Sequence, residues 1–258
     1  VVKDQAVARV SLCCGLFGNL NNEKGIIMWE IIRTATPEIV WAGLKYTIPI
    51  AVISFAIGLV IAAITALVRT STPRGNRVVK GLWYLGRAVF TFYVWLFRST
   101  PLLVQLFIVF FGLPNLGIQF DAWTAGIITF SLNTGAYASE TIRGAISSLP
   151  TSQWEAAYSL GMTYHQVLFL VIFPQALRVA LPPLSNSFIG LVKDTSLASS
   201  ITILEMFMVS QQIASHNYQP LLMYSIVAAV YAVFCTVLTI LQHALEKRMS
   251  RYVVAEGE

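Results

Sequence analysis

Polar side chains interrupt several long apolar stretches of the sequence, and they are the residues with the clearest potential for chemistry. These residues are Asn133, Glu140, Lys193, Asp194 and Ser196. A charged side chain at the centre of a bilayer costs about 2.5–3.5 kcal/mol to insert, so Lys193 and Asp194 each need a partner or an aqueous cavity. As neighbours on a helix they point about 100° apart and cannot satisfy one another on one face. We expect these two residues, with Asn133 and Ser196, to line a polar cavity that binds both charged ends of a zwitterion.

A structural role for the same charges is the alternative interpretation. Asp194 would then pair with Arg98, or Lys193 with Glu140, and neither pair would touch a solute. Arg98 lies just before Pro101 and is also placed to anchor its helix at the cytoplasmic membrane surface. The sequence leaves both interpretations open.

No group of residues is spaced for catalysis or for binding a metal ion. The three histidines are well separated, and the three cysteines form neither a C-x-x-C motif nor a cluster with histidine. The sequence also contains no G-x-x-x-x-G-K-[ST] phosphate loop. We therefore expect a protein that is not an enzyme, binds no cofactor or metal and cannot itself hydrolyse ATP.

The composition is that of a membrane protein. Apolar side chains make up 56% of the 258 residues and charged ones only 11%, against about 25% in soluble domains. Disorder is excluded as well, because it requires low hydrophobicity and high charge. The net charge of +5 does not indicate nucleic-acid binding, since the basic residues lie between apolar runs.

Five transmembrane helices are predicted from the apolar runs, so the expected fold class is an all-α membrane protein. The runs cover residues 46–68, 88–112, 123–142, 180–206 and 221–245. The clearest, 46–68, is uncharged and long enough for about 34 Å of helix. Residues 88–112 are interrupted by Pro101, and because neither half can cross a bilayer alone, we predict one kinked helix. Lys193 and Asp194 fall near the middle of the fourth run.

The basic residues predict the orientation. Cytoplasmic loops carry the excess of lysine and arginine. The tail and the loops after the first and third runs hold most of the 17 basic residues: Arg69, Arg74, Arg77, Lys80, Arg87, Arg98, Arg143, Arg178, Lys247, Arg248 and Arg251. We therefore predict the N-terminus outside and the C-terminus in the cytoplasm. The segment 69–98 contains no acidic residue, so it should fix this orientation and contact anionic lipid.

Three regions follow along the chain. Residues 1–40 form an extracytoplasmic segment, either with a helix in the outer membrane interface or as a leader. Residues 41–248 form the transmembrane domain, including a cytoplasmic loop at 150–174, and residues 249–258 form a cytoplasmic tail.

That cytoplasmic loop has its own helical order. A short helix should start at Thr151 and Ser152, with Glu155 in its first turn, where the helix dipole favours a carboxylate. Gly161 should end it as a C-cap. A second amphipathic stretch precedes Pro174, so we predict a helical hairpin docked at the membrane surface.

The spacing within this loop is specific. Glu155-Ala156-Ala157 is followed after three residues by Gly161, and then, nine residues later, by Val171, one residue, Phe173 and Pro174. This pattern resembles the EAA loop of ATP-binding cassette (ABC) importer permeases, EAA-x3-G-x9-I-x-L-P, with Val and Phe in place of Ile and Leu. The segments FRSTPLLVQLF, YASETIRGAISSLP and FPQALRVALPPLSNSFIGLVKDTSLAS resemble polar amino acid uptake permeases of the histidine/glutamine/arginine type. The resemblance covers about residues 41–248.

The resemblance implies a type I ABC importer permease in the bacterial cytoplasmic (inner) membrane. The EAA loop would enter a groove on a separate ATPase, present in two copies, which binds the ATP and Mg²⁺. Glu155 would face a basic partner, Ala156 and Ala157 would allow close approach, and Gly161 and Pro174 complete the motif. A second permease subunit, identical or homologous, an extracytoplasmic solute-binding protein and an amino acid substrate are the other implied partners.

Two other classes of protein fit the sequence less well. An ion-coupled secondary transporter or channel subunit could use Glu140, Lys193 and Asp194 as a relay, but it has no use for an EAA loop. A membrane-embedded enzyme would need converging catalytic groups, which the sequence lacks. Among amino acids, cationic, polar neutral and sulfur-containing substrates all remain open.

Overall fold

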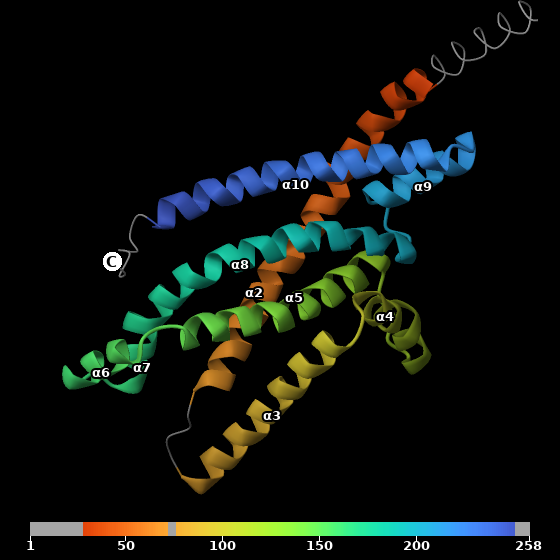
Figure 1. Cartoon of the computed structure of the whole chain (residues 1–258). Coiled ribbons are helices and arrows are strands. Elements are labelled where there is room, and N and C mark those ends of the chain that lie inside the picture. Colours follow the sequence, from red (N-terminus) through yellow and green to blue (C-terminus); the bar gives the residue numbers. More distant parts are fainter. Residues whose placement is uncertain (1–27, 72–75, 251–258) are drawn as a thin grey trace, which may run out of the picture.

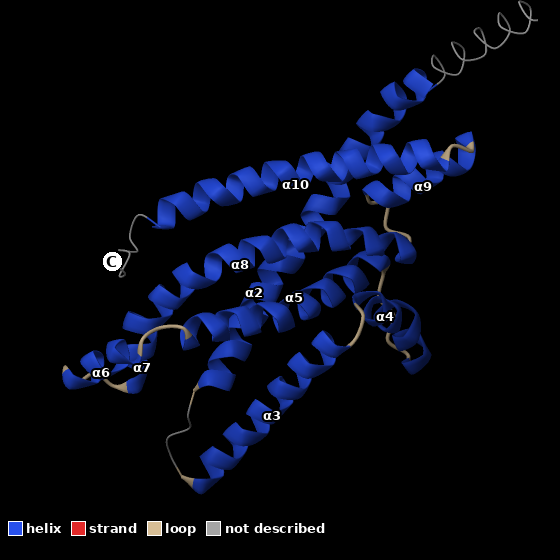
Figure 2. Cartoon of the chain, viewed as in Figure 1, coloured by secondary structure: helices blue, strands red, loops and turns tan. Residues whose placement is uncertain are grey.

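Every element of secondary structure in the described residues, 28–71 and 76–250 of a computed structural model, is helical (Figure 2). This confirms the expected all-α class. After the helix that begins at Met28 come η1 (Gly43–Thr47), α2 (Ile48–Thr70), α3 (Arg77–Ser99), α4 (Leu102–Phe107), η2 (Ile108–Gly112), η3 (Leu113–Leu116), α5 (Ala122–Ser147), α6 (Thr151–Ser159), α7 (Tyr164–Gln166), η4 (Val167–Ile172), α8 (Phe173–Asp194), η5 (Thr195–Ile201), α9 (Met206–Asn217) and α10 (Pro220–Ser250).

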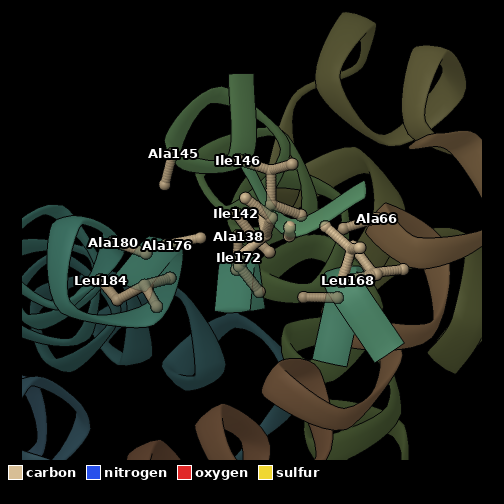
Figure 3. Packing of buried hydrophobic residues seen from close by; sticks show 13 residues of the cluster. Ala66, Ala138, Ile142, Ala145, Ile146, Leu168, Ile172, Ala176, Ala180 and Leu184 are labelled. Carbon is tan, nitrogen blue, oxygen red and sulfur yellow. The ribbon is translucent and has the colours of Figure 1, made fainter. Parts of the chain in front are cut away.

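The central helix of the bundle is α5, which packs against α2, α3 and α8 (Figure 1). Its small residues permit close approach. A β-carbon on Gly135 would lie 2.9 Å from Ile61 of α2, and one on Gly58 of α2 would lie 2.9 Å from Thr134. Toward the α6 end of the bundle, alanines and isoleucines of α5 interdigitate with Leu168 of η4 and with α8 (Figure 3). Small residues are common at helix contacts in a membrane. The hydrophobic effect does not drive helices together in apolar lipid, so close van der Waals packing must hold them.

The first apolar helix is longer than expected. One continuous helix runs from Met28 to Thr70, with a π-helical turn at η1. The boundary expected at residue 40 therefore falls inside a helix, and residues 28–40 continue directly into the first apolar run. Residues 1–27 lie outside the described part of the chain.

The second apolar run is broken and not merely kinked. Helix α3 ends at Ser99, and the segment Leu102–Leu116 leaves it at 110°. Thr100 and Pro101 are extended, because proline disfavours a helical conformation in the residue before it and supplies no N–H.

The fourth run also differs from expectation. A helix of 38 residues runs from Tyr164 to Ile201, so the second arm of the expected hairpin is the beginning of the long helix. Lys193 and Asp194 lie where α8 ends and 3-10 geometry begins, in the C-terminal part of this long helix. The hydroxyl of Thr195 favours the change from α-helical to 3-10 geometry, because it donates to the carbonyl of Val192, three residues earlier, at 2.7 Å.

Within the described residues, three helices are long and apolar enough to cross a membrane, or four if the bent pair at 110° forms one span. Helix α5 is not among them. It carries many polar and small residues, and most of these face neighbouring helices, so they need no match to lipid. Five spans and the N-out, C-in orientation stay predictions.

Candidate functional site

Helix α6 carries the EAA residues at one end of the bundle, opposite α9 (Figure 1). Pro150 is its N-cap, with an extended ψ of 139°, and the helix starts at Thr151 as predicted. The first turn contains no acidic residue, so the expectation that Glu155 lies in that turn is wrong. Glu155 lies one turn further along the helix, and its side chain is exposed. It is therefore away from the free N–H groups of the first turn, with which a carboxylate would interact.

Gly161 ends α6 in the way the sequence predicts. Its φ is +79°, a left-handed conformation that glycine adopts without strain. The Gly161 N–H donates to the carbonyl of Tyr158 at 2.9 Å, and the Met162 N–H donates to that of Ala157 at 3.3 Å. These two bonds form a Schellman motif, which satisfies the last carbonyls of the helix and fixes the angle at which the chain turns back.

One face of α6 anchors it to the bundle and leaves the other face open. Ala157 is only 4% exposed and belongs to the core between α2, α5 and α8. Trp154 stacks on Tyr164, with ring centroids 6.0 Å apart, while Glu155 and Ala156 face outward. Leu160 is 82% exposed, a large apolar side chain with no cover from the described residues. The helix therefore presents a rigid, partly apolar surface.

The second arm of the loop continues this anchor. Thr163 and Gln166 form a capping box at the start of α7. Tyr164 contacts Ser71 at the end of α2. Pro174 lies inside the continuous helix Tyr164–Ile201, directly after the π-helical segment η4. The α6 surface is thus tied to two of the long helices.

The polar residues expected in the substrate pathway fall in separate places. Asn133 on α5 donates to the Oε1 atom of Gln105 at 2.9 Å. Glu140, also on α5, binds Arg69 of α2 and Arg143. Neither structural pair considered from the sequence, Asp194 with Arg98 or Lys193 with Glu140, is among the ion pairs between described residues.

The remaining three residues lie where α8 passes into η5. Lys193 and Ser196 line one cavity of about 290 Å³ with Phe207, Tyr224 and Tyr231. Asp194 is exposed and is not part of that lining. Of the four residues expected to line one polar cavity (Asn133, Lys193, Asp194 and Ser196), two, Lys193 and Ser196, line this one.

Sequence reasoning missed two polar residues that hold the bundle together. Gln105 is 7% exposed and bonds both to the broken end of α3 and to Asn133. Glu205 is fully buried at the N-cap of α9, where it accepts the N–H groups of Phe207 and Met208 and the hydroxyl of Tyr231. An acidic residue directly before an apolar helix was the available signal for Glu205.

An all-helical bundle with several apolar helices and a rigidly anchored, exposed helix at one end defines a membrane-embedded subunit with a docking surface. Residues 84–251 match the family described as "Binding-protein-dependent transport system inner membrane component", and this chain belongs to that family. It is the permease subunit of an ABC importer in the inner membrane, as the EAA pattern indicated, and such importers work with an ATPase and a binding protein.

Named relatives agree with this assignment. The chain is 46% identical over 228 residues to the L-cystine transport system permease protein TcyB of Bacillus subtilis, covering 88% of this chain and 93% of that one. It is 34% identical over 223 residues to the glutamine transport system permease protein GlnP of Escherichia coli K12, covering 86% and 97%.

Solved structures give the same fold. A chain of an amino acid ABC transporter crystallised with histidines matches with a TM-score of 0.73 and 32% identity, over 82% of this chain and 94% of that one. A chain of the MetNI methionine transporter matches with a TM-score of 0.62 at 18% identity, over 81% and 94%, which is likeness of fold alone. The ABC importer permease fold expected from the sequence is confirmed.

Proposed function

We propose that this chain translocates amino acids across the membrane, with L-cystine as the first substrate to test, driven by ATP that a separate subunit hydrolyses. The relatives named for L-cystine and glutamine transport support the amino acid class, and the 46% identity to the cystine permease favours cystine within it. The single observation that carries the coupling is the exposed face of α6, where Glu155 and Ala156 point away from a buried anchor at Ala157.

The coupling site comprises Glu155, Ala156, Ala157, Gly161 and Pro174. Ala157 and Gly161 hold the surface in place, while Glu155 and Ala156 are the residues that would touch the ATPase. The exposed Leu160 adds an apolar contact, because a side chain 82% exposed gains free energy when a partner covers it. ATP and Mg²⁺ would bind only the partner subunit.

The assembly would contain two permease subunits and two ATPase subunits, with a solute-binding protein on the outer face. Native mass spectrometry of the complex purified through a tag on this chain measures those copy numbers. A second, different permease in the spectrum would make the pair a heterodimer.

Lys193, Asp194 and Ser196 would contact the charged groups of the substrate, and Asn133 and Glu140 would support the pathway from α5. Asp194→Asn and Lys193→Gln, assayed in vesicles with ATPase and binding protein, test this. Lost uptake with normal assembly and basal ATPase activity supports the site. Unchanged uptake in both variants would exclude it.

Reconstituted vesicles test the function as a whole. We expect uptake of labelled L-cystine only when the ATPase subunit, the binding protein and ATP are all present. Uptake that needs no ATPase and follows an imposed ion gradient would favour the secondary transporter instead. Competition by other amino acids then defines the substrate range.

A further inference from the structure

Arg98 is a charge inside an otherwise apolar helical segment. It lies in the last turn of α3, and residues 88–97 before it are uncharged, so about 16 Å of apolar helix separate it from Arg87. Charged side chains at such positions face a bundle interior or an aqueous path far more often than lipid. The bend at Thr100 and Pro101 ends the helix directly after it.

No carboxylate of the described residues neutralises Arg98. The ion pairs between described residues are formed by Arg69, Arg143 and His243. The guanidinium of Arg98 instead lies over the ring of Tyr137, 5.5 Å from its centroid. A cation–π contact contributes only about 0.5–2 kcal/mol, so it orients the guanidinium without balancing its charge.

The side chain of Arg98 lines a cavity of about 420 Å³ between α2, α3 and α5. This volume is in the range of small-molecule sites. Its polar lining comprises Arg69, Thr91, Arg98, Ser99, Tyr137 and Glu140. The only acidic residue of that lining, Glu140, is already bound by Arg69 and by Arg143. Positive charge at Arg98 therefore remains for a ligand.

We propose that this cavity is a second binding site, separate from the one proposed at Lys193, Asp194 and Ser196, and that Arg98 binds a carboxylate of the transported amino acid there. A planar guanidinium pairs with a carboxylate through two parallel hydrogen bonds, and Tyr137 holds it in the cavity. The hydroxyl of Ser99 lines the same space and offers a further donor. The Arg69–Glu140–Arg143 group keeps Glu140 from cancelling the charge. This inference rests on the proposed amino acid transport.

A direct binding experiment tests the assignment. The complex of the chain with its ATPase is placed in phosphatidylcholine nanodiscs without binding protein, and binding of labelled L-cystine is measured. Cystamine, which has the same disulfide and amino groups but no carboxylates, is the competitor. Arg98→Gln should weaken L-cystine binding about tenfold or more and abolish the preference over cystamine.

Two further variants separate recognition from folding. Arg98→Lys keeps the charge but loses the paired geometry, so its affinity should lie between those of the wild type and Arg98→Gln. Arg87→Gln removes a charge from the same helix outside this cavity, and it should bind like the wild type. Unchanged L-cystine affinity in Arg98→Gln, or an equal loss in Arg87→Gln, would overturn the proposal.

An anionic lipid headgroup shares the chemistry of a carboxylate and is the competing ligand. Nanodiscs that also contain phosphatidylglycerol distinguish the two. If Arg98→Gln releases bound phosphatidylglycerol while L-cystine affinity stays constant, the site belongs to lipid and the proposal is wrong. If the wild type neither binds nor transports any amino acid, the proposed function is wrong as well. If the wild type transports L-cystine and Arg98→Gln binds it with unchanged affinity, only the assignment of this cavity is wrong.

Discussion

The side-chain amide of Asn133, on α5, donates a hydrogen bond of 2.9 Å to the side-chain oxygen of Gln105, on α4. The amide of Gln105 in turn donates to the carbonyls of Phe97 and Thr100 at 2.9 and 3.0 Å. One buried glutamine thus satisfies carbonyls that the break after α3 leaves unpaired and ties the bend to the central helix. This explains how the polypeptide turns by 110° without exposing backbone groups to an apolar surrounding.

Gln105→Leu should destabilise the bend. It removes the donor to the carbonyls of Phe97 and Thr100 and leaves the Asn133 amide with only a long bond of 3.5 Å to the Phe97 carbonyl, at a cost of about 1–3 kcal/mol. The midpoint of thermal unfolding in detergent measures the loss. Asn115→Leu, at an exposed position in η3, is the matched control and should leave the midpoint unchanged. Equal midpoints for both variants would show that the Gln105 bonds contribute nothing.

Glu155→Lys should weaken docking of the ATPase and uncouple transport, because it reverses the exposed charge of α6 while leaving the buried anchor intact. Co-purification of the ATPase and ATP-dependent uptake both report the change. Glu30→Lys makes the same charge reversal at an exposed position of the first helix and should have no effect on either. Normal uptake by Glu155→Lys would contradict the coupling assignment.

Gly161→Ala should shift the geometry of the coupling surface. An alanine in the left-handed conformation costs about 1–2 kcal/mol, and the Schellman turn of α6 depends on that conformation. We expect weaker ATPase assembly with normal membrane insertion. Gly144→Ala is the control, since a β-carbon there meets nothing within 4 Å and lies in helix α5, where alanine is favourable. Comparable assembly by the two variants would argue against the turn.

A cysteine at Asn76 should resist impermeant thiol reagents added outside intact cells. Asn76 is the exposed N-cap of α3, and the basic residues of 69–98 predict that this end lies in the cytoplasm. The test uses a variant in which Cys13, Cys14 and Cys235 are replaced. Labelling before the cells are permeabilised would reverse the predicted orientation.

Local pattern determined much of this protein from sequence alone. The apolar runs predicted helices at α2, α5 and α10, because helical periodicity and length are properties of neighbouring residues. The EAA spacing likewise identified α6 and the turn at Gly161, since a left-handed C-cap depends on the glycine itself.

Tertiary structure alone decided which polar groups meet. Arg69 and Glu140 are 71 residues apart, and Asn133 and Gln105 are 28 apart, so no local pattern connects either pair. The partner of a buried polar group depends on how helices pack, and in an apolar surrounding each such group must find one. For this reason the sequence could name Asn133 and Glu140 as costly residues, while only the fold shows them paired and leaves Arg98 with a cavity in place of a carboxylate.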